Sequence, residues 1–128
     1  MEFKILIIDR DQSDLDSIKK VFNYEGYDIT VTNDPDEGRY LLETTSPDLV
    51  VLDTGAGISD ALFYRKNNGK GNPVPCLFTF SEFTSEIDIC GRCPYGCLKK
   101  PFGIKELLAK VRQIISQREQ LGEWVCKH

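Results

Sequence analysis

Short apolar runs alternate with longer amphipathic stretches along the chain. Apolar and β-branched residues dominate five runs that we predict as strands, over residues 4–9, 27–32, 49–53, 74–79 and 97–99. The stretches between them carry apolar residues at three- and four-residue spacing, which is typical of amphipathic helices. This alternation predicts βαβ units built around a parallel sheet.

Five helices are expected between and after these runs. One of three polar residues can cap the first helix: Asp11, Ser13 or Asp14. Gly26 ends that helix, and Asp34-Pro35 opens a second one that continues to about residue 45. Less regular helices are expected at about residues 59–67 and 82–91, and Pro101 precedes a long last helix. The apolar positions that share one face are Leu15, Ile18, Val21 and Phe22 in the first helix, and Ile104, Leu107, Leu108, Val111, Ile114 and Ile115 in the last.

The character of each run predicts its place in the sheet. Residues 4–9 have no polar face, as in a central strand that helices cover on both sides, whereas residues 27–32 alternate like a strand nearer an edge. In the fourth run, Pro75 cannot donate a ladder hydrogen bond. Right-handed crossovers then favour an α/β fold of the (βα)5 type, a doubly wound parallel sheet of five strands with the flavodoxin-like order 2-1-3-4-5.

Composition narrows the class of protein. The chain has 128 residues, of which 41% are hydrophobic, and a formal net charge of -4, which suits one globular domain over residues 1–121 with a frayed tail at 122–128. No dense Lys/Arg stripe is present, so we expect no direct binding to nucleic acid. The N-terminal apolar run is too short for a signal peptide or a membrane span, so we expect a cytoplasmic protein without a membrane partner.

Chemically informative residues follow the predicted strands. Asp9, Asp53 and Thr79 stand at three strand ends and Lys100 comes just after a fourth, and the carboxyl ends of parallel strands form the usual site of such a sheet. Two nearby carboxylates repel unless a cation intervenes, and oxygen ligands favour Mg²⁺. A carboxylate can also attack a phosphoryl group and form an aspartyl phosphate.

Four segments resemble one family along the whole chain: ILIIDRD, PDLVVLD, LFTF and LKKPF. In their order and spacing they are similar to the receiver domains of two-component response regulators, such as the chemotaxis-type receivers. The resemblance implies that Asp53 is the phosphoacceptor and Asp9 an acidic-pocket residue. It also implies that Thr79 is the hydroxyl that senses the phosphoryl group and that Lys100 is the lysine that contacts it. Asp9, Asp53 and the backbone carbonyl of Gly55 would then hold Mg²⁺.

The sequence departs from that family at several of these positions. Arg10 stands where a second acid is usual, and it can either be a solvated residue or replace the metal by pairing with Asp9 or Asp53. The second case describes a pseudo-receiver, a binding module that is not phosphorylated. The loop TGAGISDA lacks the usual proline and Asp-Gly, and Cys97 takes the place of the aromatic switch residue. If the register of the fourth strand slips, Ser81 rather than Thr79 supplies the hydroxyl.

The five cysteines allow a further alternative. Without a secretory context, reduced thiols are the default expectation. Cys90, Cys93 and Cys97 nevertheless form a C-x2-C-x3-C cluster, with Cys76 in the neighbouring strand. A soft metal, an Fe-S cluster or a reversible disulfide would make the domain a thiol-based sensor, whereas buried thiols would simply fill the core.

The leading hypothesis is a phosphoacceptor in phosphorelay signal transduction, and not an enzyme. A sensor histidine kinase or phosphotransfer protein, or a small phosphodonor, would pass its phosphoryl group to Asp53 with Asp9 and Mg²⁺ assisting. Phosphorylation would change the face formed by the fourth helix, the fifth strand and the fifth helix. A downstream effector protein or domain, or a second copy in a homodimer, would read that change.

Overall fold

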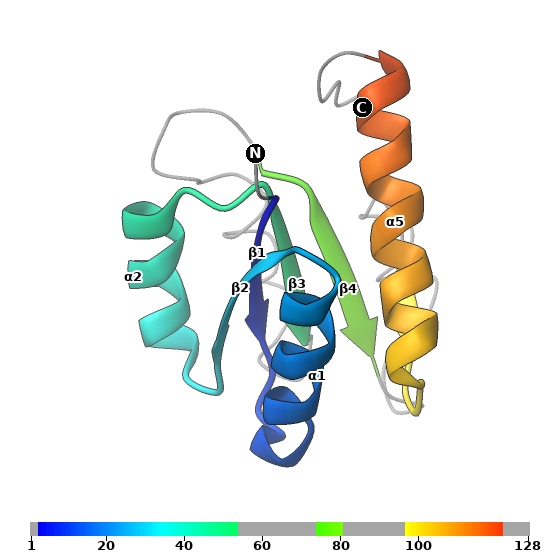
Figure 1. The fold of residues 1–128 in the computed structure, drawn as a ribbon. Coiled ribbons are helices and arrows are strands. Elements are labelled where there is room, and N and C mark those ends of the chain that lie inside the picture. Colours follow the sequence, from blue (N-terminus) through cyan, green and yellow to red (C-terminus); the bar gives the residue numbers. More distant parts are fainter. Residues whose placement is uncertain (1–2, 54–73, 81–96, 122–128) are drawn as a thin grey trace.

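The computed structural model describes residues 3–53, 74–80 and 97–121, without the side chains of residues 12–14 and 118–121 (Figure 1). The helices expected at about residues 59–67 and 82–91, the loop containing Gly55, and the tail at 122–128 lie outside the described residues, as do Ser81, Cys90 and Cys93. Among the described helices, none combines the length and the hydropathy that crossing a membrane requires.

Five parallel strands form one sheet in the order β2-β1-β3-β4-β5, which confirms the predicted fold class. The strands are β1 (Lys4–Ile8), β2 (Asp28–Thr32), β3 (Leu49–Asp53), β4 (Cys76–Phe80) and β5 (Cys97–Lys99). The described helices are α1 (Gln12–Tyr24), α2 (Pro35–Thr45) and α5 (Ile104–Leu121). As predicted, β2 lies at one edge and β1 in the interior of the sheet (Figure 1).

The sheet separates two apolar clusters. Alternate residues of β1 and β3 enter one cluster with the apolar faces of α1 and α5, whose buried members are Leu15, Ile18 and Phe22 of α1 and Leu107, Leu108, Val111 and Ile114 of α5. The other residues of β1 and β3 pack with β4 and with Leu42 of α2. Burial on both faces explains why these central strands are continuously apolar.

Local chemistry fixes where the elements begin and end. The first helix starts at Gln12, so Asp11 occupies the position before it, while Ser13 and Asp14 fall inside its first turn. The second helix begins as predicted, because the Asp34 side chain accepts the amide of Asp36 at 3.0 Å. After the first helix, Gly26 adopts a φ of 94°, a conformation that favours glycine.

The fourth strand is displaced from its predicted bounds by the proline. It runs over Cys76–Phe80 rather than over residues 74–79, because Pro75 has no amide to donate to the ladder. The carbonyl of Pro75 still accepts the amide of Val50 at 2.9 Å. In this register Thr79 lies directly beside Asp53 on the neighbouring strand.

Two aromatic residues of α1 provide a test of this packing. Phe22 is completely buried and its ring contacts that of Tyr27, whereas Tyr24 is 89% exposed. We expect Phe22→Ala to lower the free energy of unfolding by about 3–5 kcal/mol, because it leaves a cavity in the core. The matched Tyr24→Ala should change it by no more than about 0.5 kcal/mol. Urea unfolding of both variants measures the difference, and equal losses would contradict the described core.

Candidate functional site

Two carboxylates and one lysine converge beyond the carboxyl ends of the central strands. The Lys100 ammonium lies 3.1 Å from one Asp9 carboxylate oxygen and 3.2 Å from the other, and 3.4 Å from a carboxylate oxygen of Asp53. The side chains of Asp9 and Asp53 are only 13% and 12% exposed. One ammonium therefore bridges two largely buried carboxylates that come from different strands.

The backbone places each of these groups. Asp9 follows β1, and its amide donates to the carbonyl of Thr32 at 3.1 Å, while Asp53 is the last residue of β3. Lys100 follows the short strand β5, and its amide donates to the carbonyl of Phe80 at 2.6 Å. The peptide bond between Lys100 and Pro101 is cis. The chain path around these strand ends thus fixes the lysine opposite the carboxylates.

Thr79 lies next to the same carboxylates. It is the register partner of Asp53 on β4, and partners in adjacent strands present their side chains on the same face of a sheet. Thr79 is only 2% exposed. The register of β4 therefore brings the predicted hydroxyl to the predicted acceptor.

Arg10 occupies a different position from the two carboxylates. The Asp9 side chain accepts the amide of Asp11 at 2.9 Å, and this hydrogen bond closes a turn with Arg10 at its middle. The Arg10 side chain is exposed, and within the described part of the chain it forms no ion pair with Asp9 or Asp53. Lys100, rather than Arg10, is the cation that contacts both.

The amide of Asp11 is a contributor that sequence reasoning missed. The sequence predicts only a helix cap for Asp11, whereas its backbone amide also donates to one carboxylate oxygen of Asp9. The Asp-x-Asp spacing is the signal that could have found it, because aspartate side chains commonly bind the amide two residues ahead.

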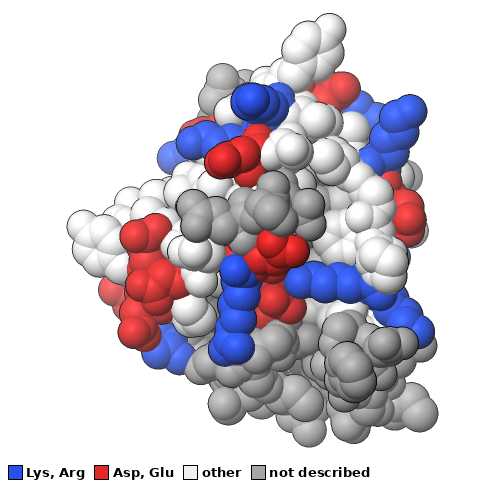
Figure 2. Space-filling model, turned by 90° about the horizontal axis from the view of Figure 1, so that it is seen from below, with Lys and Arg blue, Asp and Glu red and all other residues white. Residues whose placement is uncertain are grey.

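Acidic and basic side chains are distributed unevenly over the face at the carboxyl ends of the strands (Figure 2). Figure 2 views the molecule from the side on which the carboxyl ends of the strands lie. Acidic side chains gather at the centre of that face, and basic side chains lie on two sides of them. An anion that approaches the acidic centre would therefore need cations to offset the repulsion.

Burial raises the pKa of the Asp9 carboxyl above its usual value. The hydrogen bond from the Asp11 amide and the charge of Lys100 lower this pKa, and the neighbouring Asp53 carboxylate raises it further. For Asp9, burial outweighs the favourable contacts with Lys100 and with the Asp11 amide.

This donor set suits a small hard cation. Mg²⁺ prefers oxygen ligands, accepts one or two carboxylates and keeps several of its waters. Asp9 and Asp53 contact the same ammonium, so their carboxylates are close enough to share one cation. No cluster of three or more His, Cys, Asp or Glu side chains suited to a metal occurs among the described residues, and Gly55 lies outside them. Two carboxylates are therefore what the described chain offers to Mg²⁺.

The cysteines differ partly from expectation. Cys97 of β5 is disulfide-bonded, so the default expectation of reduced thiols is wrong for this residue. Cys76 is free and buried, as a small apolar residue in the core would be. Sequence spacing could not settle whether two sulfur atoms approach closely enough to bond.

The raised pKa of Asp9 predicts how stability depends on pH. The folded state holds the Asp9 proton more tightly than the unfolded chain, so this residue lowers the free energy of unfolding as pH rises through its folded pKa. Asp9→Asn removes the penalised charge, keeps an oxygen for the Asp11 amide and leaves Lys100 paired with Asp53. We expect the variant to have a higher Tm than the wild type at neutral pH in metal-free buffer.

That advantage should shrink as the pH is lowered through the raised pKa of the wild-type carboxyl toward the ordinary aspartate value of about 4, because the wild-type side chain then loses its charge as well. Thermal unfolding across this range measures it, and Asp16→Asn, which removes an exposed carboxylate of α1, controls for net charge. A variant that is less stable than the wild type at neutral pH would show that the contacts of Asp9 outweigh its burial.

The chain is similar in sequence to known response regulators. No family model matches the chain. It is 30% identical over 121 residues to the response regulator MprA of Mycobacterium tuberculosis and 31% identical over 121 residues to that of Mycolicibacterium vanbaalenii. These alignments cover 90% of this chain and 51% of each relative, so the chain spans about half the length of the curated relatives it matches.

Solved structures agree with these relatives. A response regulator receiver modulated diguanylate cyclase from Pelobacter carbinolicus matches with a TM-score of 0.76 and 25% identity, over 94% of this chain and 97% of that one. A response regulator from Thermotoga maritima matches with a TM-score of 0.74 and 18% identity, over 91% and 99%. Both the fold and the sequence relatives thus agree with the resemblance noted at the strand ends. The chain is a receiver domain of the response-regulator type.

Proposed function

We propose that this receiver domain accepts a phosphoryl group on Asp53 in phosphorelay signalling. The observation that carries the proposal is the Lys100 ammonium, which contacts both Asp53 and Asp9. A lysine held against a buried carboxylate can neutralise a phosphoryl oxygen once that carboxylate is modified. Phosphoryl transfer depends mainly on such positioning and charge compensation.

In the proposed reaction, a carboxylate oxygen of Asp53 attacks the phosphorus of a phosphohistidine or of a small acyl phosphate. The new bond joins that oxygen to phosphorus, while the bond from phosphorus to the imidazole nitrogen or the acyl oxygen breaks, and the leaving group takes its electron pair. Lys100 is close enough to pair with one new phosphoryl oxygen, and Thr79 on the adjacent strand can donate its hydroxyl to another. Mg²⁺ bound by Asp9 and Asp53 would supply further charge compensation.

The proposed partners follow from this chemistry. A sensor histidine kinase or a phosphotransfer protein would donate the phosphoryl group, and an effector protein or domain would respond to it. The described part of the expected output face is formed by β5, which directly precedes Lys100 along the chain, and by α5, which follows it. In this role the domain is a stoichiometric acceptor and not an enzyme.

Incubation with acetyl phosphate and Mg²⁺, followed by intact mass measurement, tests the acceptor. We expect the wild type to gain one phosphoryl group that alkali removes, because acyl phosphates hydrolyse readily in alkali. Asp53→Asn should gain none, and the control Asp16→Asn should behave as the wild type does. An unmodified wild type, or an undiminished adduct on Asp53→Asn, would refute the proposal.

Arg10 provides a separate prediction about the metal. Its positive charge follows Asp9 directly in the sequence and opposes the binding of a divalent cation. We expect Arg10→Ala to raise the affinity for Mg²⁺ about fivefold, as roughly 1 kcal/mol of relieved repulsion would do. Calorimetric titration measures this, with Lys20→Ala, at an exposed position of α1, as the charge-matched control.

An unchanged affinity would show that Arg10 is an ordinary solvated residue. If wild-type protein bound no Mg²⁺ and Arg10→Ala restored binding, the pseudo-receiver interpretation of the wild type would be supported instead.

A further inference from the structure

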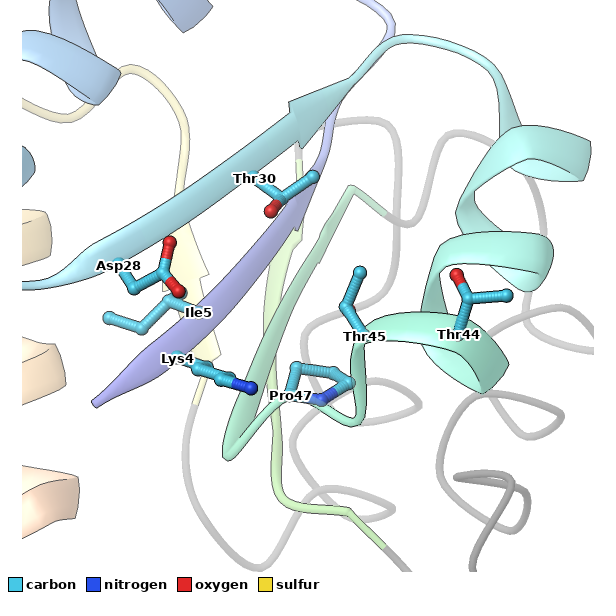
Figure 3. Close-up of a pocket in the computed structure, with 7 residues that line it drawn as sticks. All are labelled: Lys4, Ile5, Asp28, Thr30, Thr44, Thr45 and Pro47. Atoms are coloured by element: carbon cyan, nitrogen blue, oxygen red, sulfur yellow. The ribbon is translucent and has the colours of Figure 1, made fainter. Parts of the chain in front are cut away.

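A polar cavity lies at the opposite end of the sheet from Asp53. It has a volume of about 230 Å³ and is open to solvent on the side of the sheet that α2 covers. Figure 3 shows its lining, which comes from the start of β1, the first three residues of β2, the end of α2 and the segment after that helix: Lys4, Ile5, Asp28, Thr30, Thr44, Thr45 and Pro47. Because Lys4 begins β1 and Asp9 follows that strand, this cavity is separate from the acceptor site.

The alternation of β2 explains why the cavity is polar. Ile29 is buried in the cluster with α1 and α5, and Val31 packs against that cluster. Asp28 and Thr30, which alternate with these two residues along the strand, therefore face the side of α2. The chain leaves α2 at Ser46, which adopts a left-handed conformation, and turns into Pro47. This early turn leaves the start of the edge strand incompletely covered.

Two opposite charges line the cavity without pairing. Lys4 and Asp28 are register partners on adjacent strands. Within the described part of the chain, neither side chain forms an ion pair with the other or with a third group. Figure 3 shows the Lys4 ammonium directed toward Pro47 and the Asp28 carboxylate on the side of Thr30. The cavity thus presents a cation and an anion at separate points of its wall.

Thr44 and Thr45, at the end of α2, make the part of the cavity wall formed by that helix polar. The Thr44 hydroxyl donates to the carbonyl of Tyr40 at 2.9 Å, and the Thr45 hydroxyl donates to that of Leu41 at 2.7 Å. Their oxygens can therefore only accept further hydrogen bonds. The end of α2 also carries the negative pole of the helix dipole. This part of the wall favours an ammonium group, whereas Lys4 favours a carboxylate.

We propose that this cavity binds a small zwitterion of the α-amino acid type. The ligand's ammonium would bind the Asp28 carboxylate and the threonine oxygens, and its carboxylate would bind the Lys4 ammonium. The volume lies below the roughly 300–1,000 Å³ of sites for drug-sized molecules, which favours a small ligand. Lys4 and Asp28 are both exposed, so each contact is weak and binding falls in the millimolar range.

Titration of the ¹⁵N-labelled 128-residue chain with L-alanine, monitored through its amide resonances, tests this proposal. Ethylamine lacks only the carboxylate of alanine and propionate lacks only its ammonium, so the two compounds isolate the contribution of each charge. We expect saturable shifts at Thr30, Thr44 and Thr45 with alanine, and at least about fivefold weaker binding of either single-charge compound. No saturable shift, or equal binding of all three, would overturn the proposal.

Charge-neutralising variants locate the ligand. Asp28→Asn and Lys4→Gln should each weaken alanine binding about fivefold. Asp16→Asn and Lys19→Gln remove the same charges from exposed positions of α1, which packs on the other face of the sheet, and should leave it unchanged. Equal effects from both pairs would contradict this site. Asp53→Asn should bind alanine as the wild type does, so the outcome does not depend on phosphorylation.

Discussion

The site depends on one electrostatic constraint, which is that two carboxylates must be held together in a poorly solvated place. Asp9 and Asp53 each form an ion pair with Lys100, yet burial still raises the pKa of Asp9. Burying two carboxylates side by side is unfavourable for folding by itself. The pair persists because the packing of the rest of the sheet offsets this cost. The apolar strands β1 and β3, buried on both faces, supply the packing that keeps the two strand ends adjacent. The packing that stabilises the fold therefore lies in the middle of the central strands, and the candidate site lies at their carboxyl ends.

The same electrostatic constraint also involves β5, the last strand in the sheet order, because Lys100 follows that strand. Lys100 reaches the carboxylates from β5, which pairs only with β4 among the described strands. A short strand is sufficient here, because the amide of Lys100 continues the ladder by donating to Phe80. Four neighbouring strands thus contribute to one site, each through a residue at its carboxyl end or directly after it.

Much of this arrangement could be predicted from the sequence, because it follows from periodicity and from residues that stop strands and helices. The apolar run of β1 and the alternation of β2 indicated an interior and an edge strand correctly. The first residue of β4 was predicted two residues too early, although the missing amide of Pro75 was the sequence signal that placed the start after it. The contact of one ammonium with both carboxylates and the amide bond from Asp11 depend on the three-dimensional path of short connections. The cavity beside α2 arises from incomplete coverage of one strand by one helix, which no local pattern encodes.

The short connection after Lys100 has a mechanical consequence. Only residues 101–103 separate this lysine from α5, whose first turns are anchored in the core by Leu107 and Leu108. So short a tether has little slack, and a backbone displacement at Lys100 must be absorbed within these residues or transmitted to the helix. The same few peptide units that place the lysine at the carboxylates therefore join the site directly to the start of α5.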